Sequence, residues 1–451
     1  MVKDNTLLTP RWYPLIHHPQ HDAWWNSKAR FCIVPAGRRS GKTEIGKRRL
    51  VTKALSFCEA PNGRFVAGAP THKQAKRIYW QDLKAMVPRE LLCPWMRKPI
   101  SESELTIHLY NGARIEVCGL DVPERMEGDP LDHILLDEYG NVKKDAWDAH
   151  IMPGLFTLGR PPGTGDLIGV PEGRNHYYKT YQRAVAGLEN WEAFTWKSSD
   201  ILPPEQIRQA KGELDPLTYA QEYEASFVTF AGRAYYQYSS EHNTEQRLID
   251  YYDDEAPLIL CFDFNVDPGV CVICQEVEYE GSNANCADRI TAVIDEVHIV
   301  NNSNTLMVCD KILKKYRKHK GLVKCYGDPA GGARGTAKIN GNDWELIKSC
   351  LVPYFDERLK FDVGRSAPSE RIRLNCVNSR ISSTNGTIRL LVDPLNAVKT
   401  SEDLEGVRTD EQGHIDKKSD MTLTHLSDAL GYYIERSFPI SCGRVVRSQQ
   451  I

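Results

Sequence analysis

The sequence lacks the long apolar stretch that a membrane-crossing helix requires. No run of about 18 apolar residues occurs anywhere in its 451 residues. The segment from Met1 to Thr9 also lacks the charged-then-apolar order of a secretion signal. We therefore expect no membrane association and a protein that stays in the cytoplasm.

The sequence also lacks a cysteine framework. Its 13 cysteines are scattered, and several lie in apolar runs, which predicts reduced and buried thiols. The single C-x-x-C pair, Cys271 and Cys274, falls inside an expected strand, where residues three apart face opposite ways. Zinc binding is therefore not expected.

No strong excess of one charge is present, since 57 basic residues stand against 60 acidic ones for a net charge of −3. This balance neither indicates nor excludes a nucleic-acid binder, because such binding depends on local basic surface. The densest basic run, residues 311–320, fits either a solvated helix face or a surface facing DNA.

The length predicts two or three domains, and the first half alternates strands with helices. This order predicts an α/β fold with a mostly parallel sheet and helices on both faces. Residues 105–120 predict a hairpin that turns at Asn111-Gly112. The expected strands are 31–35, 64–69, 133–136 and 166–170, with a helix at 44–55 and an amphipathic helical stretch at 203–230.

The second half has a different order, which is that of a ribonuclease H-like nuclease. Three successive strands are expected at 258–265, 269–279 and 289–300, and helices then alternate with strands. The later strands are expected at 323–327 and 387–392, with helices from 305, at 369–383 and at 424–436. The predicted domains are residues 1–197, a helical lid and linker at 198–254, and residues 255–451.

A phosphate-binding loop follows the first strand. Ala36 stands at the first glycine position of the G-x-x-x-x-G-K-[ST] pattern, and the rest of the pattern fits between a strand and a helix. Lys42 is expected to contact the β- and γ-phosphates, and Thr43 to hold Mg²⁺. The candidate nucleotide-binding residues of the loop are Gly37, Arg38, Arg39, Ser40, Gly41, Lys42 and Thr43.

Two acidic residues, Asp137 and Glu138, end the apolar strand at 133–136. Asp137 would complete the Mg²⁺ coordination, and Glu138 would orient and deprotonate the attacking water, which suits ATP hydrolysis. Arg38 or Arg39 is a candidate to stabilise charge on the γ-phosphate, although either could instead be solvated or hold the loop. Gln20 is a candidate for reading adenine, with a capping or surface role as the alternative.

Three aspartates in the second half could form a metal-dependent cutting site. Asp263 and Asp328 each end a strand, and Asp428 lies on the last helix. Carboxylates suit Mg²⁺ or Mn²⁺, and two such ions about 4 Å apart would activate water and stabilise the leaving oxygen. Asp267 and Glu296 are possible further ligands, for which a turn and a solvated strand end are the favoured alternatives.

Taken together, these motifs make the chain resemble the large terminase subunit of tailed bacteriophages. The resemblance runs from about Trp12 to Arg436 and also includes residues 171–175 and 425–432. It implies an N-terminal packaging ATPase and a C-terminal nuclease that cuts concatemeric DNA. The residues that match the family's ATPase motifs are Lys42, Thr43, Asp137, Glu138 and Arg38. Those that match its nuclease acids are Asp263, Asp328 and Asp428.

The resemblance also implies partners. These are double-stranded DNA, the portal protein and its procapsid, the small terminase subunit, and further copies of the chain in a ring on the portal, with a monomer as the alternative in solution. The expected location is the host cytoplasm and not the mature virion. The family's coupling motif often carries Ser or Thr where Gly169-Val170-Pro171 stands here, so the coupling residue is left open.

Two other functions compete with a packaging motor. A nuclease-helicase of repair or recombination would need a second ATPase-like lobe, and fewer than 90 residues separate Val170 from the nuclease half. A scaffold that only binds nucleotide and DNA would not need Glu138 or the three aspartates.

Overall fold

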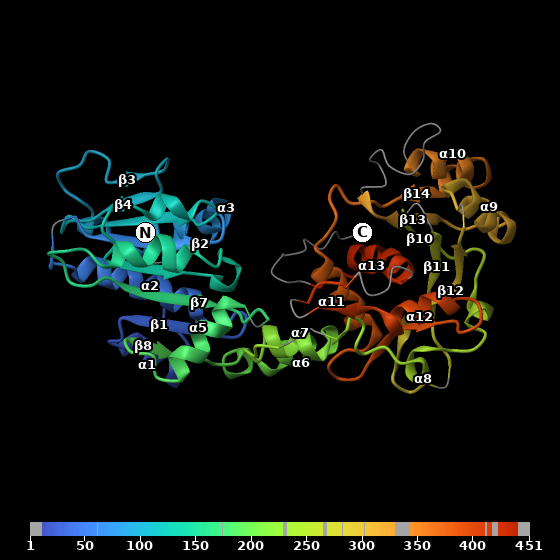
Figure 1. The fold of residues 1–451 in the computed structure, drawn as a ribbon, viewed down its shortest axis with the longest axis horizontal. Helices are drawn as coiled ribbons and strands as arrows, with labels where there is room; N and C mark the ends of the chain where they lie inside the picture. Colours follow the sequence, from blue (N-terminus) through green and yellow to red (C-terminus); the bar gives the residue numbers. More distant parts are fainter. Residues whose placement is uncertain are drawn as a thin grey trace, which may run out of the picture. The chain divides into compact units, whose positions relative to one another are not determined.

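The computed structural model describes residues 11–60, 62–173, 175–228, 232–264, 268–281, 283–301, 303–329, 343–410, 413–416 and 423–440. The chain forms two compact units (Figure 1). The first holds the residues up to Ile207 together with Ala220–Val228, and the second holds Arg208–Tyr219 and the residues after Val228. The segment 198–254 contributes to both units, and its role as a separate lid stays a prediction.

The first unit is built on an eight-stranded sheet in the order β3-β4-β5-β2-β6-β7-β1-β8. The strands from β5 to β8 in that order run parallel, and β3 and β4 join one edge as antiparallel strands. The predicted parallel sheet and the hairpin with its turn at Gly112 are thus confirmed. The strands are β1 (Phe31–Pro35), β2 (Arg64–Ala69), β3 (Ile100–Ser101), β4 (Thr106–His108), β5 (Arg114–Gly119), β6 (His133–Leu136), β7 (Thr164–Gly169) and β8 (Trp191–Ala193).

Helices surround this sheet in Figure 1. They are α1 (Pro19–Asn26), α2 (Lys42–Ser56), α3 (His72–Ala75), α4 (Gln81–Met86) and α5 (His176–Val185). Two helices, α6 (Pro204–Glu213) and α7 (Pro216–Glu222), replace the single helical stretch predicted at 203–230. The break falls before Pro216, which begins α7, because proline is favoured at a first helical position and disfavoured inside a helix.

Short 3₁₀ and π-helical turns connect the longer elements of the first unit. They are η2 (Lys76–Trp80), η3 (Arg89–Leu91), η4 (Pro123–Met126), η5 (Tyr139–Asn141), η6 (Ala146–Ile151), η7 (Met152–Leu155) and η8 (Ser198–Asp200). Of these, η5 matters most for function because it directly follows Glu138.

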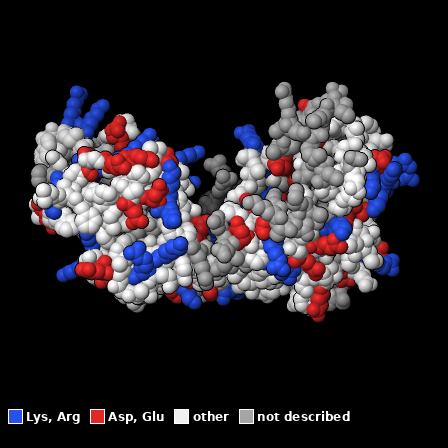
Figure 2. Space-filling view, in the orientation of Figure 1, with Lys and Arg blue, Asp and Glu red and all other residues white. Residues whose placement is uncertain are grey.

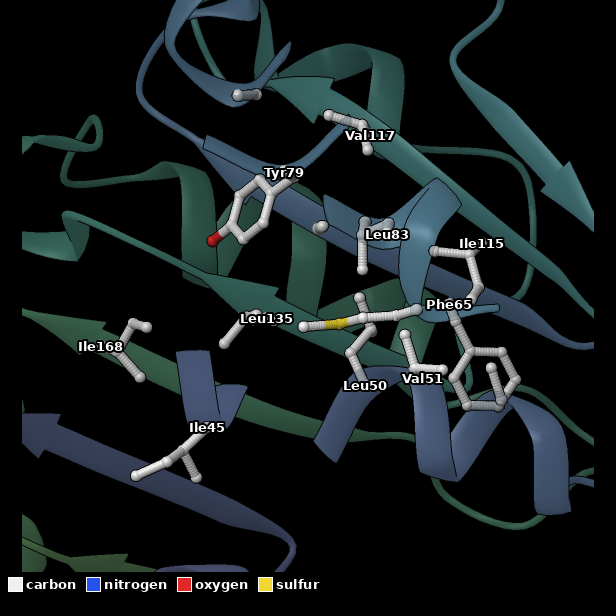
Figure 3. Close-up of a cluster of buried hydrophobic side chains, with 14 of the residues drawn as sticks. Ile45, Leu50, Val51, Phe65, Tyr79, Leu83, Ile115, Val117, Leu135 and Ile168 are labelled. Atoms are coloured by element: carbon white, nitrogen blue, oxygen red, sulfur yellow. The ribbon is translucent and has the colours of Figure 1, made fainter. Parts of the chain in front are cut away.

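Helix α2 packs on the sheet through its apolar face. Leu50 and Val51 belong to one buried cluster with Phe65 of β2 and Leu135 of β6 (Figure 3). A Cβ at Gly46 would lie 2.8 Å from a methyl group of Leu135, so the glycine lets α2 approach β6 closely. This packing fixes the start of α2, and therefore Lys42 and Thr43, beside the end of β6.

A buried ion pair ties α1 and α2 to the sheet. Arg49 of α2 lies 3.0 Å from Asp166 of β7, and their side chains are 4% and 1% exposed. Asp166 also accepts the indole N–H of Trp24 at 3.2 Å, and Arg49 donates to the carbonyl of Trp25 at 2.7 Å. The pair therefore fastens α1 to the core of the first unit.

Replacing Asp166 with alanine is expected to destabilise the first unit by about 3–5 kcal/mol, because Arg49 would remain buried without its partner. Denaturant unfolding of the full chain, followed by tryptophan fluorescence, measures this change. Asp148→Ala, at an exposed position of the same unit, is the matched control. An unfolding midpoint equal to that of the control would contradict the assigned role of the pair.

The second unit contains a six-stranded sheet in the order β14-β13-β10-β11-β12-β15. β10, β11 and β12 are antiparallel neighbours, and β13 and β14 run parallel to β10 on its other side. The ribonuclease H-like order predicted from the sequence is confirmed. The strands are β10 (Leu258–Asp263), β11 (Gly269–Glu278), β12 (Cys286–Ile299), β13 (Val323–Gly327), β14 (Leu359–Phe361) and β15 (Ile388–Val392), with a separate pair β9 (Gly232–Arg233) and β16 (Arg408–Thr409).

Helix α13 crosses the sheet of the second unit at the candidate cutting site. It packs against β10, β11 and β13 and against α11 and α12. The helices of the unit are α8 (Ser240–Asn243), α9 (Thr305–Tyr316), α10 (Asp343–Phe355), α11 (Glu370–Ile381), α12 (Val398–Gly406) and α13 (His425–Ser437), with turns η9 (Leu248–Tyr251) and η11 (Asp356–Arg358). Helices α10 and α12 and strand β14 were not predicted from the sequence.

The cysteine pair behaves as predicted for a strand. Cys271 and Cys274 of β11 are both buried and free, and they belong to different apolar clusters on the two faces of the sheet. Among the described residues, no three His, Cys, Asp or Glu side chains are close enough together to hold a metal ion.

Basic and acidic side chains alternate over the face of the molecule shown in Figure 2. The basic run at 311–320 includes three lysines with acidic partners: Lys314 with Asp310, Lys315 with Asp295, and Lys320 with Asp254. These pairs favour the solvated helix face over a DNA-facing surface. In the described part of the chain, no helix is both long and apolar enough to span a membrane.

Candidate nucleotide and nuclease sites

The phosphate loop joins β1 to α2, and contacts within the first unit hold its backbone. The N–H of Ala36 donates to the carbonyl of Gly169 at 3.1 Å, and the N–H of Gly37 donates to the carbonyl of Trp196 at 3.0 Å. The indole of Trp196 donates to the carbonyl of Ser40 at 2.9 Å. The loop is therefore shaped by its neighbours, and Trp196 contacts it at two points.

Glycine is needed at two positions of this loop. Gly41 has a φ of 91°, which side chains disfavour. A Cβ at Gly37 would collide with the hydroxyl of Ser198 and lie 2.8 Å from the carbonyl of Tyr223. In this structure Gly37 thus allows a close approach between protein segments, while its predicted contact with phosphate stays a prediction.

Lys42, Thr43 and Asp137 meet at the start of α2. The hydroxyl of Thr43 donates to Oδ2 of Asp137 at 2.7 Å, and the ammonium of Lys42 lies 3.3 Å from the carbonyl of Gly37. Burial lowers the pKa of Lys42, and the carboxylates of Glu138 and Asp137 oppose that effect. The adjacent oxygens of Thr43 and Asp137 are hard donors, so this pair fits Mg²⁺.

Glu138 directly follows the strand and has an unusual backbone. Its φ of 53° and ψ of 42° are left-handed, a conformation that residues other than glycine adopt uncommonly. Burial and the neighbouring Asp137 raise the pKa of its carboxyl, Lys42 and Arg38 oppose that effect, and together these influences bring the pKa to about 7. A carboxylate with this pKa is suited to accept a proton from water near neutral pH.

Arg38 and Arg39 have different environments. Nε of Arg38 pairs with Glu222 at 2.5 Å, and the backbone N–H of Arg38 donates to the carbonyl of Glu222 at 2.6 Å. Arg39 is exposed and has a left-handed φ of 56°. The catalytic role predicted for one of them stays a prediction, and Glu222 was not predicted as a partner of this loop.

Gln20 lies in the first turn of α1. Its backbone N–H donates to Nδ1 of His18 at 3.3 Å, which caps the helix. The ring of His21, the next residue, lies 4.6 Å from that of Trp196 and close to Gly41. Helix α1 therefore reaches the phosphate loop, and adenine recognition by Gln20 stays a prediction.

The three nuclease aspartates lie around helix α13. Asp263 ends β10, where its Oδ2 is 3.3 Å from Nδ1 of His425, the first residue of α13. Asp328 follows β13 and is hydrogen bonded to Tyr432. Asp428 lies one turn into the helix. The structure thus brings the predicted acids to one helix, although they do not form a three-ligand metal site among the described residues.

Arg373 of α11 is a neighbour of this site that was not predicted from the sequence. Its guanidinium pairs with Asp428 at 2.9 Å, with both side chains less than a tenth exposed. Burial opposes its charge, but Asp428 together with further neighbouring groups acts in the opposite direction, and the pKa of Arg373 is raised. Arg373 also lies over the ring of Tyr432 at 4.3 Å. In this structure Asp428 is therefore neutralised by a cation from the protein.

Glu296 and Asp267 are the two further residues that were predicted as possible metal ligands. Both oxygens of Glu296 accept hydrogen bonds at the start of α12, from the N–H groups of Lys399 and Thr400 at 2.8 and 2.7 Å. This contact favours a capping role over metal binding. Asp267 lies outside the described residues. Asp403, which was not predicted from the sequence, accepts the N–H groups of Leu426 and Ser427, and burial raises its pKa to about 6.

Comparison with known proteins gave matches in sequence and in fold. A scan of protein-family profiles found no match. The chain is 25% identical over 235 residues to the large terminase subunit of Escherichia phage T5, covering 50% of this chain and 51% of that protein. It is 25% identical over 249 residues to that of Thermus phage G20c, with 49% and 50% covered. The chain thus spans about half the length of the curated relatives it matches.

The fold is similar over a greater length. The large terminase of a thermophilic bacteriophage superposes with a TM-score of 0.63 over 94% of this chain and 99% of that one, at 14% identity. The same terminase in complex with ATP-γ-S gives a TM-score of 0.60 over 93% and 98%. The chain is therefore similar to large terminase subunits of bacteriophages, in sequence over about half of its length and in fold over nearly all of it.

Proposed function

We propose that this chain is the ATP-hydrolysing subunit of a motor that packages double-stranded viral DNA, and that its second unit cuts that DNA. The observation that best supports this is the hydrogen bond between Thr43 and Asp137 at 2.7 Å, with Lys42 and Glu138 beside it. These groups are what nucleotide hydrolysis requires at the end of a parallel strand.

Each residue of the nucleotide site has a separate role in this proposal. Lys42 would attract the phosphates of ATP, and Thr43 and Asp137 would hold Mg²⁺, whose chemistry would be to neutralise charge on the phosphates. Glu138 orients the attacking water and accepts its proton. Arg38 would reach the γ-phosphate only after leaving Glu222. The complex of the thermophilic phage terminase with ATP-γ-S supports the choice of nucleotide.

The cutting reaction is assigned to the second unit. Asp263, Asp328 and Asp428 would hold the two Mg²⁺ or Mn²⁺ ions, whose chemistry is to activate water and stabilise the leaving oxygen. The carboxylates are suitable donors for such ions, and in this structure Asp428 is paired with Arg373. His425 orients Asp263 from the neighbouring helix.

The proposed partners follow from the family. They are double-stranded DNA, the portal protein on its procapsid, the small terminase subunit, and other copies of this chain in a ring. A nuclease-helicase would need a second ATPase-like lobe. The described residues between β8 and β10 contain only short helices, 3₁₀ turns and the two-residue β9, and no second ATPase-like sheet, which disfavours that function.

A packaging assay tests the proposed function directly. The chain is mixed with procapsids that carry the portal, linear duplex DNA, Mg²⁺ and ATP, and DNA protected from added nuclease is measured. We expect protection that depends on ATP and on procapsids. Unwinding of a forked duplex without procapsids, and no protection with them, would instead identify a helicase.

A further inference from the structure

Two side chains at the start of α5, which is distant in sequence, form hydrogen bonds to the turn after Glu138. The amide Nδ2 of Asn175 donates to the carbonyl of Gly140 at 2.9 Å. The ring Nε2 of His176 donates to the carbonyl of Tyr139 at 3.0 Å, since a carbonyl can only accept. Two consecutive carbonyls directly after the candidate catalytic base are thus bound by two consecutive residues of another element.

This turn needs support, because its backbone is strained. A left-handed conformation such as that of Glu138 is unfavourable for a residue with a side chain and persists only where the surroundings hold it. Two short-range bonds contribute: Glu138 N–H donates to Asp137 at 2.8 Å, and Asn141 N–H donates to the carbonyl of Glu138 at 2.8 Å. The bonds from Asn175 and His176 add an anchor from outside the turn.

The tip of β7 completes the arrangement. A Cβ at Gly169 would lie 3.3 Å from the nitrogen of Tyr139 and 3.5 Å from Cα of Glu138, so the absent side chain lets the strand touch the turn. The carbonyl of Gly169 accepts from Ala36 of the phosphate loop at 3.1 Å and from the hydroxyl of Tyr177 at 3.4 Å. Helix α5 therefore contacts the turn of Glu138 and, through Gly169, the phosphate loop.

Helix α5 also contacts the segment Ala220–Val228. The ring of Phe227 lies 5.2 to 5.5 Å from the rings of Tyr177, Tyr178 and Tyr181. The same segment supplies Glu222, the partner of Arg38. The start of α5 is thus connected to both sides of the nucleotide site.

We propose that Asn175 and His176 are positioning residues for ATP hydrolysis, which fix the carboxylate of Glu138 by holding the carbonyls of Gly140 and Tyr139. This inference rests on the proposed function of the site. Its physical basis is that a shift of about 1 Å in a catalytic group can lower the rate about 10²-fold without changing how the substrate binds. The two residues act on Glu138 through the backbone of its turn.

Asn175 offers a substitution that separates this role from helix capping. Its Oδ1 accepts the N–H of Tyr177 at 2.9 Å and caps α5, while its Nδ2 binds the turn. Aspartate caps a helix as well as asparagine but has no N–H to donate. Asn175→Asp should therefore keep the cap of α5 and replace the bond to Gly140 with a repulsion between two oxygen atoms.

The experiment measures kcat, KM and the affinity for a fluorescent ATP analogue in the full chain with duplex DNA. We expect Asn175→Asp to lower kcat about 10-fold or more, with KM, affinity and melting temperature unchanged. His176→Ala should lower kcat likewise, and His176→Gln, which keeps an N–H donor, should restore part of it. Lys179→Ala, an exposed position on the same helix, is the matched control.

Two results would overturn the proposal while leaving the proposed function intact. One is wild-type turnover in Asn175→Asp. The other is a fall in kcat matched by an equal loss of ATP affinity, since that would indicate a general disturbance of the site. A wild-type chain that binds ATP but never hydrolyses it would overturn the proposed function, and this inference with it.

Discussion

Replacing Glu138 with glutamine is expected to leave ATP bound and to slow its hydrolysis by about 10²–10⁴-fold. Glutamine has the size of glutamate and keeps an oxygen acceptor, but it cannot take a proton from water at neutral pH. Burial and the neighbouring Asp137 raise the pKa of the Glu138 carboxyl to about 7, a value that suits this transfer. Phosphate release and the affinity for a fluorescent ATP analogue, measured on the same preparation, test both parts of the prediction.

The matched control for this prediction is Glu189→Gln, at an exposed position of the same unit. It should hydrolyse ATP at the wild-type rate. DNA packaging by Glu138→Gln should stop together with hydrolysis, because the motor would be held with ATP bound. Normal turnover in Glu138→Gln would show that another group accepts the proton and that Glu138 is not the catalytic base.

Much of the first unit could be predicted because its signals are local. An apolar strand, a glycine-rich loop and a helix are adjacent in sequence, and Asp137-Glu138 directly follows a second apolar strand. In the structure these two segments are joined through Thr43 and Asp137. Local signals are sufficient here because the carboxyl ends of the parallel strands β1 and β6 lie at the same edge of one sheet, with β7 between them.

The supporting residues of the site could not be predicted in the same way. Glu222, Trp196 and His176 act through contacts with residues far away in sequence, and nothing in their local pattern distinguishes them from ordinary surface or core positions. The residue that couples hydrolysis to movement could not be predicted either, because Gly169 stands at the tip of β7 where the family often has Ser or Thr. In the structure, Asn175 and His176 contact the turn after Glu138.

The second unit shows where local patterns fail. Helix α10 contains Pro353, which normally argues against a helix interior, and it was missed. Strand β14 has only three residues and lies at the edge of the sheet, so its alternation is too short to recognise. The order of the longer strands was predictable, because β10, β11 and β12 are long apolar runs that follow one another.

Replacing Asp263 with alanine is expected to lower DNA cleavage at least about 10²-fold and to leave ATP hydrolysis unchanged. The carboxylate ends β10, the central strand that pairs with both β11 and β13, and it contacts His425 of α13 at 3.3 Å. A metal ion held by this carboxylate would supply several kcal/mol of charge stabilisation in the transition state. Losing it corresponds to a fall in the cleavage rate of this size. Conversion of plasmid DNA to linear products, with Mg²⁺ or Mn²⁺ added, measures cleavage, and phosphate release measures hydrolysis.

The independence of the two activities is the strongest part of this prediction, because the two sites belong to separate compact units. Asp310→Ala, which removes a surface carboxylate that pairs with Lys314 on α9, is the matched control and should cut DNA normally. Undiminished metal-dependent cutting by Asp263→Ala would show that the acids around α13 are not the nuclease site. A loss of both activities at an unchanged melting temperature would show instead that hydrolysis depends on the second unit, contrary to the assignment of the two reactions to separate sites.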